Sequence, residues 1–284
     1  MASVTTARPT PAFAGEAPSP RGGFMTAFST LTRRRFALTV RTPRELFVPL
    51  LTPILFALVI APALKVALNA TSAYESFVAI GTVGLLIPLN TMFSGLSVII
   101  DKESGARREL LAAPIPRPLL VFGNLAVAIS ITALQVVALL IAALARGIDF
   151  QTSASGVAWF VSAGALFAVG MYGLAETLAS RVPKQEEYIS RLPAVAILPW
   201  FLAGSLFPIN ALPWVLEDIA KVLPLTHGLA LMRYGLLGDQ NGLHNIWGMD
   251  SVTTMAGLSL LVVGVFASAL TAISVRVFSR AAMD

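Results

Sequence analysis

Long apolar stretches separated by short polar segments make up most of the chain between residues 46 and 275. A helix that crosses the hydrocarbon layer of a bilayer needs about 20 mostly apolar residues. Six stretches reach this length or come close to it: 46–64, 76–100, 119–145, 157–179, 192–209 and 252–275. The pattern predicts an all-α integral membrane protein with six transmembrane helices.

Prolines interrupt the first and the fifth of these stretches. They are Pro49, Pro53, Pro62, Pro193, Pro199 and Pro208. A proline removes a backbone hydrogen bond and kinks a helix, and in lipid such a break persists only where neighbouring helices or water satisfy the freed groups. We therefore expect both segments to pack inside the bundle or to dip in and out of the membrane.

The residues before the first stretch divide into two parts. Residues 1–23 are rich in Pro, Ala, Ser and Thr, lack an apolar run and predict a disordered tail instead of a signal peptide. Residues 24–44 predict an amphipathic interface helix, because Phe24, Phe28, Leu31 and Leu38 fall on one helical face.

Arginines of this helix are candidate contacts for a cytoplasmic partner: Arg33, Arg34 and Arg35. The amphipathic pattern is imperfect, because Arg35 lies in the middle of the apolar face. A positively charged flank with no further role is the alternative interpretation.

Composition supports lipid as the main solvent of the chain. Apolar residues make up 56% and charged residues 12%, against about 45–50% and about 25% in soluble globular domains. A soluble enzyme is therefore excluded. The chain has no Cys and only two His, which excludes disulfides and thiolate nucleophiles and leaves little for a metal site, so we expect neither a metal nor catalytic residues.

The distribution of basic residues predicts the orientation. Cytoplasmic loops of membrane proteins collect Lys and Arg. With the N-terminus inside, 16 of the 20 basic residues lie in the tail, the inner loops and the C-terminus, and four lie outside: Lys65, Arg146, Lys221 and Arg233. We expect both termini in the cytoplasm and the chain in a plasma membrane. The bias toward Arg over Lys and the Ala-rich composition are compatible with a high-GC bacterium.

The loop between the second and third stretches, residues 101–118, is the most informative polar segment. It carries seven charged residues, and residues 106–113 can form a short helix that Pro114 ends. A short charged helix held at the mouth of two spans is suited to docking a partner. An ordinary positively charged inner loop is the alternative.

Two motifs support a family resemblance. The first is E-x-G-x-x-x-E-L-L-x-x-P, from Glu103 to Pro114, and the second runs from Leu198 to Arg233 with the segments Gly-Ser-Leu-Phe-Pro, Leu-Pro-Trp and Pro-Leu-Thr before the final Arg. On these motifs residues 24–280 resemble the membrane subunit of ABC-2 type ATP-binding-cassette exporters. The resemblance implies a transmembrane domain over 24–284, a second permease copy or paralogue, and two cytoplasmic ABC ATPase subunits.

The resemblance also implies roles for particular residues. The loop after the second span resembles the coupling helix that sits in a groove of the ATPase. The residues that this assigns to coupling are Glu103, Gly105, Arg107, Arg108, Glu109, Leu110 and Pro114. The segment around Pro213–Lys221 resembles the short external re-entrant helices between spans five and six. His227 stands where the family often has an aromatic residue, and we expect it to be solvated, without a proton-sensing role.

The chain does not carry an ATP site of its own. A P-loop has the pattern G-x-x-x-x-G-K-[ST], and none of the four lysines follows a glycine. We expect no cofactor on this chain, with ATP and Mg²⁺ bound by the partner subunit.

Polar and aromatic residues of the spans are candidates for a substrate path or gate. They are Asn90, Gln135, Glu176, Trp200, Phe201 and Phe207. Glu176 either reaches water or pairs locally near the end of its span, or belongs to the path. The two amides either bond across helices or line the path, and the aromatics form an interfacial belt or an exit.

Small residues recur four positions apart in the last span, at Gly264, Ser268 and Ala272. Such a stripe allows close helix approach in lipid. The stripe is compatible with contacts inside one subunit or between two copies.

The interpretation that combines these features is a permease subunit of an ATP-driven exporter. The sparse charge within the spans favours an apolar or amphipathic substrate, such as a drug, lipid or glycolipid. A stand-alone proton-coupled carrier is the first alternative. An intramembrane lipid-modifying enzyme is the second, although the adjacent Glu186 and Glu187 do not face each other on a helix. We expect no nucleic-acid partner.

Overall fold

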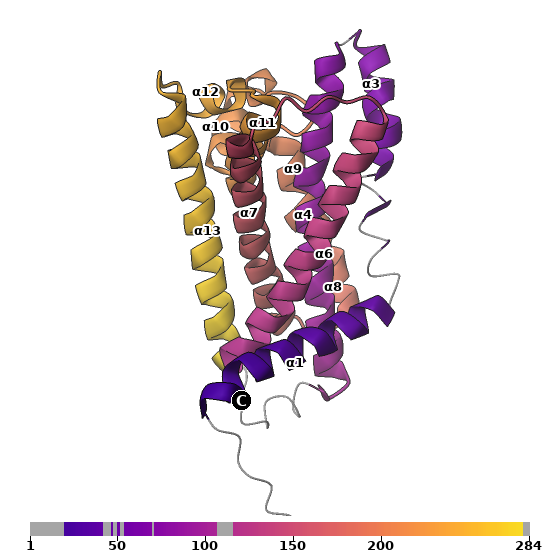
Figure 1. Cartoon of the computed structure of the whole chain (residues 1–284), viewed down its shortest axis with the longest axis vertical. Helices are drawn as coiled ribbons and strands as arrows, with labels where there is room; N and C mark the ends of the chain where they lie inside the picture. Colours follow the sequence, from indigo (N-terminus) through magenta and orange to yellow (C-terminus); the bar gives the residue numbers. More distant parts are fainter. Residues whose placement is uncertain are drawn as a thin grey trace, which may run out of the picture.

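The computed structural model describes residues 20–41, 47, 50–51, 54–69, 71–106 and 116–280. Its secondary-structure elements are all helices. Figure 1 shows a bundle of long helices, with α1 (Pro20–Arg41) across one end and short helices gathered at the other. We call these the α1 end and the α12 end. The interface helix thus begins four residues before the expected start, and most of the expected tail lies outside the described residues.

Within the described ranges, four helices are long and apolar enough to cross a membrane. They are α4 (Ser72–Glu103), α6 (Arg117–Ala145), α7 (Ala154–Arg181) and α13 (Val252–Arg280). They confirm the second, third, fourth and sixth expected spans and make this a multi-pass membrane protein. The apolar part of α4 is 78% buried against 22% for α13, so α4 lies at the centre of the bundle and α13 at its periphery.

The first and fifth expected spans consist of shorter helical pieces. In the first, the π turn η1 (Phe56–Ile60) leads into α3 (Ala61–Ala67). The fifth, expected over 192–209, lies partly in a continuous helical run of α8 (Gln185–Leu192), the π turn η2 (Pro193–Ile197) and α9 (Leu198–Leu202). This run begins seven residues earlier than expected and ends at Leu202, where turns follow. The π turn begins at Pro193, which is one of the expected breaks. The count of six spans stays a prediction.

One buried stripe joins the α8–η2–α9 run to the rest of the molecule. Its members are spaced four residues apart: Tyr188, Leu192, Ala196 and Trp200. The Tyr188 hydroxyl donates to the backbone oxygen of Met92, and the Trp200 indole N–H donates to that of Gly81, each at 2.7 Å. Both acceptors belong to α4, so the broken segment packs against the central helix as its prolines predicted.

Close approach between α7 and α13 does not use the expected stripe of small residues. A Cβ atom at Gly173 of α7 would lie 2.7 Å from the backbone carbon of Leu270, so glycine is required on the α7 side. A Cβ at Gly264 would meet nothing within 4 Å, and Ser268 and Ala272 are exposed. Among the described residues the stripe therefore makes no close helix contact, and contact between two copies stays a prediction.

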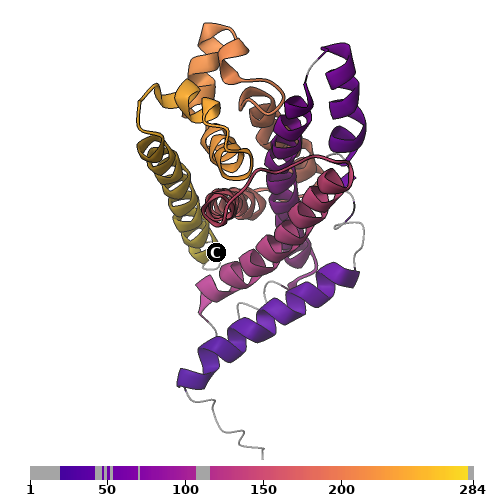
Figure 2. The same ribbon diagram turned by 45° about the horizontal axis from the view of Figure 1, so that its top comes forward.

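Short helices close the α12 end, as Figure 2 shows. After the turn η3 (Ile209–Ala211) come α10 (Trp214–Val222), α11 (Pro224–Leu237) and α12 (Asn241–Trp247). Eleven of the 14 residues of α11 are buried, which makes it part of the core between α4, α7 and α13. Helix α10 therefore lies where the short external helix was expected, around Pro213–Lys221. Its re-entrant character stays a prediction.

His227 of α11 is buried, so the expectation of a solvated histidine is wrong. The Trp247 indole N–H donates to Ser259 Oγ at 2.8 Å, and Ser259 Oγ lies 3.2 Å from His227 Nδ1. His227 Nε2 lies 2.9 Å from the Lys221 carbonyl oxygen, so Nε2 is the donor and Nδ1 accepts from Ser259. A neutral imidazole with its proton on Nε2 therefore satisfies both hydrogen bonds of His227. The sequence placed His227 in a polar outer segment, but α11 folds inward.

The close contact at Gly95 of α4 generates a stability prediction. A Cβ at Gly95 would lie 2.2 Å from the Tyr188 hydroxyl oxygen, so Gly95→Ala displaces that ring and its hydrogen bond to Met92. We expect the free energy of unfolding to fall by about 1–3 kcal/mol. Gly164→Ala is the matched control, because its Cβ would meet only two side-chain ends at 3.8 Å. Thermal unfolding in detergent measures both, and equal stabilities would contradict the packing.

The His227 network predicts a pH dependence. Burial lowers the pKa of the His227 imidazole below its usual value of 6.5. The unfolded chain then binds a proton more readily than the folded chain, so His227 contributes stability that is complete above about pH 6.5 and is lost as the pH falls.

Thermal unfolding at pH 7.5 and 5.5 checks this dependence. We expect a smaller difference between the two pH values in His227→Gln than in the unmodified chain. His244→Gln is the control, because His244 is exposed and should leave the difference unchanged. A His227→Gln variant with the full difference would show that another group causes it.

Candidate functional site

Helix α1 packs against the bundle with the face that holds Arg35 and Thr39. Figures 1 and 2 show it running beside the α1 end of α6. Arg35 and Thr39, four residues apart, are buried, whereas Arg33 and Arg34 are exposed. The position of Arg35 in the apolar face is thus explained, because this face packs against protein and its arginine has a partner there.

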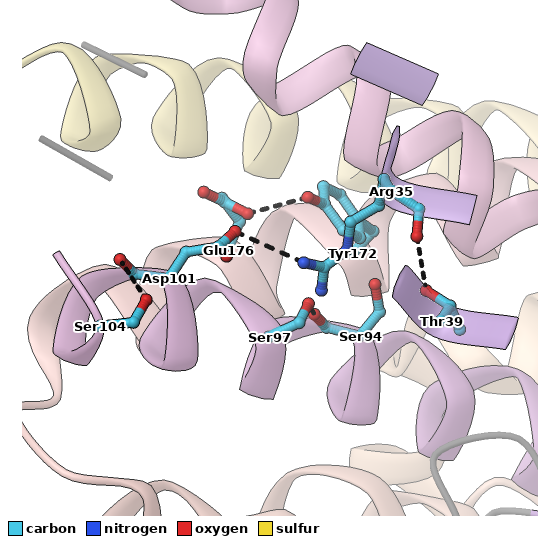
Figure 3. Close-up of polar contacts among 8 residues, drawn as sticks. All are labelled: Arg35, Thr39, Ser94, Ser97, Asp101, Ser104, Tyr172 and Glu176. Carbon is cyan, nitrogen blue, oxygen red and sulfur yellow. Dashed lines mark hydrogen bonds and ion pairs between the residues drawn. The ribbon is translucent and has the colours of Figure 1, made fainter. Parts of the chain in front are cut away.

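The partner of Arg35 is Asp101, near the end of α4. Arg35 Nη1 lies 3.4 Å from Asp101 Oδ2, and the two side chains are only 9% and 17% exposed (Figure 3). Breaking a buried ion pair leaves an uncompensated charge, which is costly. The pair therefore ties α1 to the end of α4 at which the candidate docking loop begins.

Glu176 of α7 lies beside this pair. Its carboxylate is fully buried and accepts a hydrogen bond of 2.8 Å from the hydroxyl of Tyr172, one turn earlier on the helix (Figure 3). The carboxylate thus pairs locally with Tyr172 and is not exposed, and a role of Glu176 in the path stays a prediction. We call Arg35, Asp101, Tyr172 and Glu176 the junction, because α1, α4 and α7 meet there.

The end of α4 shows why its motif contains glycine. The Ser104 and Gly105 N–H groups donate to the carbonyls of Ile100 and Lys102, and Gly105 adopts a φ of +78°. This left-handed conformation ends helices and is disfavoured for residues with a Cβ. Gly105 therefore redirects the chain out of α4.

Only part of the expected coupling set lies within the described residues. Glu103 is the last residue of α4, and its Oε2 accepts a bond of 2.6 Å from Gln185 Nε2 of α8. The other expected coupling residues lie outside the described part of the chain: Arg107, Arg108, Glu109, Leu110 and Pro114. The docking role of the loop stays a prediction.

The structure does not gather the candidate path residues into one site. Asn90 lines a cavity of about 30 Å³ with Arg35 and Thr39, near the junction. Trp200 is buried against α4, and its ring lies 4.9 Å from that of Phe201. The remaining candidates are Gln135, buried on α6, and Phe207, which is partly exposed. Their roles in a path or gate stay predictions.

Sequence reasoning missed two members of the junction. In the sequence Asp101 is one of seven charged residues of its loop, and Tyr172 lies in an apolar stretch where nothing distinguishes it from its neighbours. The usable signal was Arg35, because an arginine on an apolar helix face needs a partner supplied by the protein, and a buried carboxylate is one such partner. Among the described residues, no group of three or more His, Asp or Glu is suited to hold a metal ion.

The Arg35–Asp101 pair predicts the result of a charge swap. Arg35→Glu places two carboxylates together, and we expect the free energy of unfolding to fall by about 1–3 kcal/mol. The double variant with Asp101→Arg should recover part of this loss, which a double-mutant cycle measures. Arg34→Glu is the matched control, because Arg34 is exposed. If the effects of the two single changes on the free energy of unfolding simply add in the double variant, the pair contributes nothing to stability.

Known protein sequences are similar to this chain over most of its length. The sequence model of the family "ABC-2 type transporter" matches residues 26–237. The protein ycf38 of Porphyra purpurea, whose name describes it as a transport permease, is 26% identical over 211 residues, 72% of each chain.

Two proteins named nodulation protein J are also similar. That of Rhizobium meliloti (strain 1021) is 31% identical over 75 residues, 26% of this chain and 29% of its own. That of Rhizobium leguminosarum bv. trifolii is 25% identical over 168 residues, 58% of this chain and 63% of its own. Since the family match covers most of the chain, the protein belongs to the ABC-2 type transporter family and is a multi-pass transport permease.

Proposed function

We propose that this permease is the membrane subunit of an ATP-driven exporter, and that the junction transmits movement of a docked ATPase to the interface helix. Membership of the family implies an ATPase partner in general. A separate ATPase is needed, because the sequence has no P-loop. The partner complement that we propose is two ATPase subunits and a second permease copy or paralogue.

The observation that carries this proposal is the ion pair between Arg35 and Asp101. It joins α1 to α4 two residues before Glu103, where the loop with the coupling motif begins. A force applied to that loop acts on α4 and, through the pair, on α1. Glu103 extends the connection to the α8–η2–α9 run through Gln185. One docking event thus moves three elements of the α1 end together.

The proposed substrate is an apolar or amphipathic molecule, such as a drug, lipid or glycolipid. Charged residues of α4, α6 and α13 lie within five residues of the ends of these helices, and Glu176 of α7 is hydrogen-bonded to Tyr172. A path between such helices offers little to a bare ion. The proposed location is a bacterial plasma membrane, with both termini in the cytoplasm.

The test is gentle extraction of the tagged full chain from its native membrane, followed by identification and stoichiometry of what stays bound. We expect a P-loop ATPase in equal amount. It should be lost in the double variant Arg108→Glu with Glu109→Lys, which reverses both charges of the expected coupling helix. Arg34→Glu, an exposed change outside the loop, should retain it.

A second readout separates docking from transmission. In Arg35→Glu the ATPase should still co-purify, but stimulation of its activity by the permease should fall at least several-fold. A chain that purifies alone, and shows no nucleotide-dependent transport when neighbouring ATPases are supplied, would overturn the proposal. The stand-alone carrier would then be favoured, and Glu176 would be the first residue to change.

A further inference from the structure

A cavity of about 350 Å³ lies at the α12 end, opposite the junction. Its walls come from the start of α4, the turn after α9, α11 and α12. The residues that matter here are Phe77, Asn210, Thr226, Arg233, Asp239 and Asn245. A volume of this size lies in the range of small-molecule sites and far exceeds what one water molecule fills.

Arg233 brings a positive charge into this cavity and interacts electrostatically with Asp239 of the same lining, but it forms no ion pair within 4 Å among the described residues. The side chain is only 5% exposed. Its Nη atoms donate to the carbonyls of Gly204, Ser205 and Phe77 at 2.9–3.3 Å, and the guanidinium lies 3.4 Å from the centre of the Phe77 ring. Backbone dipoles and a ring face therefore hold the charge.

Two buried donors at the cavity have no hydrogen-bond partner in the part of the chain described. One is Nε of Arg233. The three bonds above all come from Nη1 and Nη2, so they use three of the five guanidinium N–H donors and leave Nε without an acceptor among the described residues. The other is the hydroxyl of Thr226, a residue that is only 3% exposed. A buried polar group without a partner is costly, and a bound acceptor would remove that cost.

The rest of the lining offers acceptors as well as donors. Asp239 Oδ1 accepts the backbone N–H of Asn241 at 3.0 Å, which fixes its carboxylate at the start of α12. The amides of Asn210 and Asn245 each provide both donor and acceptor atoms. A cationic donor group beside acceptors for hydroxyls matches a ligand that combines an anionic group with alcohol groups.

We propose that this cavity, which we call the α12 pocket, binds a phosphate ester that carries hydroxyl groups. The phosphate oxygens accept from Arg233 and Thr226, and the hydroxyls bond to Asp239 and the asparagines. Two sources share this chemistry: the headgroup of a glycerophospholipid, and a soluble glycerol phosphate. Binding requires only this chain, so it is measured without an ATPase and can fail or succeed independently of the export function.

Native mass spectrometry of the purified full chain tests the lipid source. The probes are phosphatidylglycerol and, as its phosphate-free counterpart, dioleoylglycerol. Isothermal titration with glycerol phosphate, and with glycerol as the counterpart, tests the soluble source. We expect one of the two phosphate compounds to bind at least tenfold more tightly than its counterpart.

Thr226→Val tests for binding in the α12 pocket, and we expect this variant to keep its fold. The change removes a hydroxyl that makes no hydrogen bond in the structure, so stability should not fall. The affinity for the phosphate compound should fall about tenfold, which is the order expected for one hydrogen bond to a charged group. Thr132→Val of α6 is the matched control, because its hydroxyl is also buried and unbonded but lies outside the lining of the pocket.

Arg233→Lys adds a second measurement, because it keeps the charge and removes the guanidinium fork. If this variant loses its fold, Thr226→Val alone still decides. Selective binding of phosphatidylglycerol, or of glycerol phosphate, that weakens in Thr226→Val and not in Thr132→Val supports the proposal and identifies the source. Binding no tighter than that of the counterparts, or equal binding in both threonine variants, would overturn it and leave a pocket that holds water only.

Discussion

Backbone carbonyl groups buried away from water set the main constraint on this molecule. In lipid each of them needs a partner supplied by the protein. Long side chains with N–H or O–H groups provide these partners at the irregular places of the fold. Arg233 donates to the buried carbonyls that follow α9, and at a more exposed place Arg146 donates to the carbonyl of Leu58 in the π turn η1. The broken helices can exist within the bundle because these donors reach them.

The same constraint explains how the helices find each other. Trp200 and Tyr188 donate to α4 at Gly81 and Met92, which are separated by about three turns of the helix. Two fixed points at this distance set both the position and the tilt of the α8–η2–α9 run. Apolar packing alone would allow that run to slide, since lipid is as apolar as the helix surface. Hydrogen bonds therefore give the packing its register.

The sequence predicted the long helices well, because a run of apolar residues is a local property. The irregularity expected at Pro193 is also local, and a π turn within the continuous helical run begins there. The pairing of Arg35 with Asp101, 66 residues apart, depends on how α1 crosses the bundle, and hydropathy carries no such information. The prediction that His227 is solvated was wrong for a related reason. The polar neighbours of α11 suggested an outer segment, whereas its burial results from folding back between three long helices. Arg146 and Arg233, counted as charges of outer loops, are hydrogen-bond donors to backbone.

The unequal enclosure of the long helices has a consequence for how this chain tolerates sequence change. Most of the apolar surface of α13 lies outside the core, so exchanges among Leu, Ile, Val and Phe on its outward face alter few contacts within the chain. Helix α4 touches protein on nearly every side, and a single added methyl group has no space at Gly81 or Gly95. Sequence drift should therefore accumulate along α13 and be nearly absent along α4, which makes α4 the part of the chain from which distant members can best be aligned.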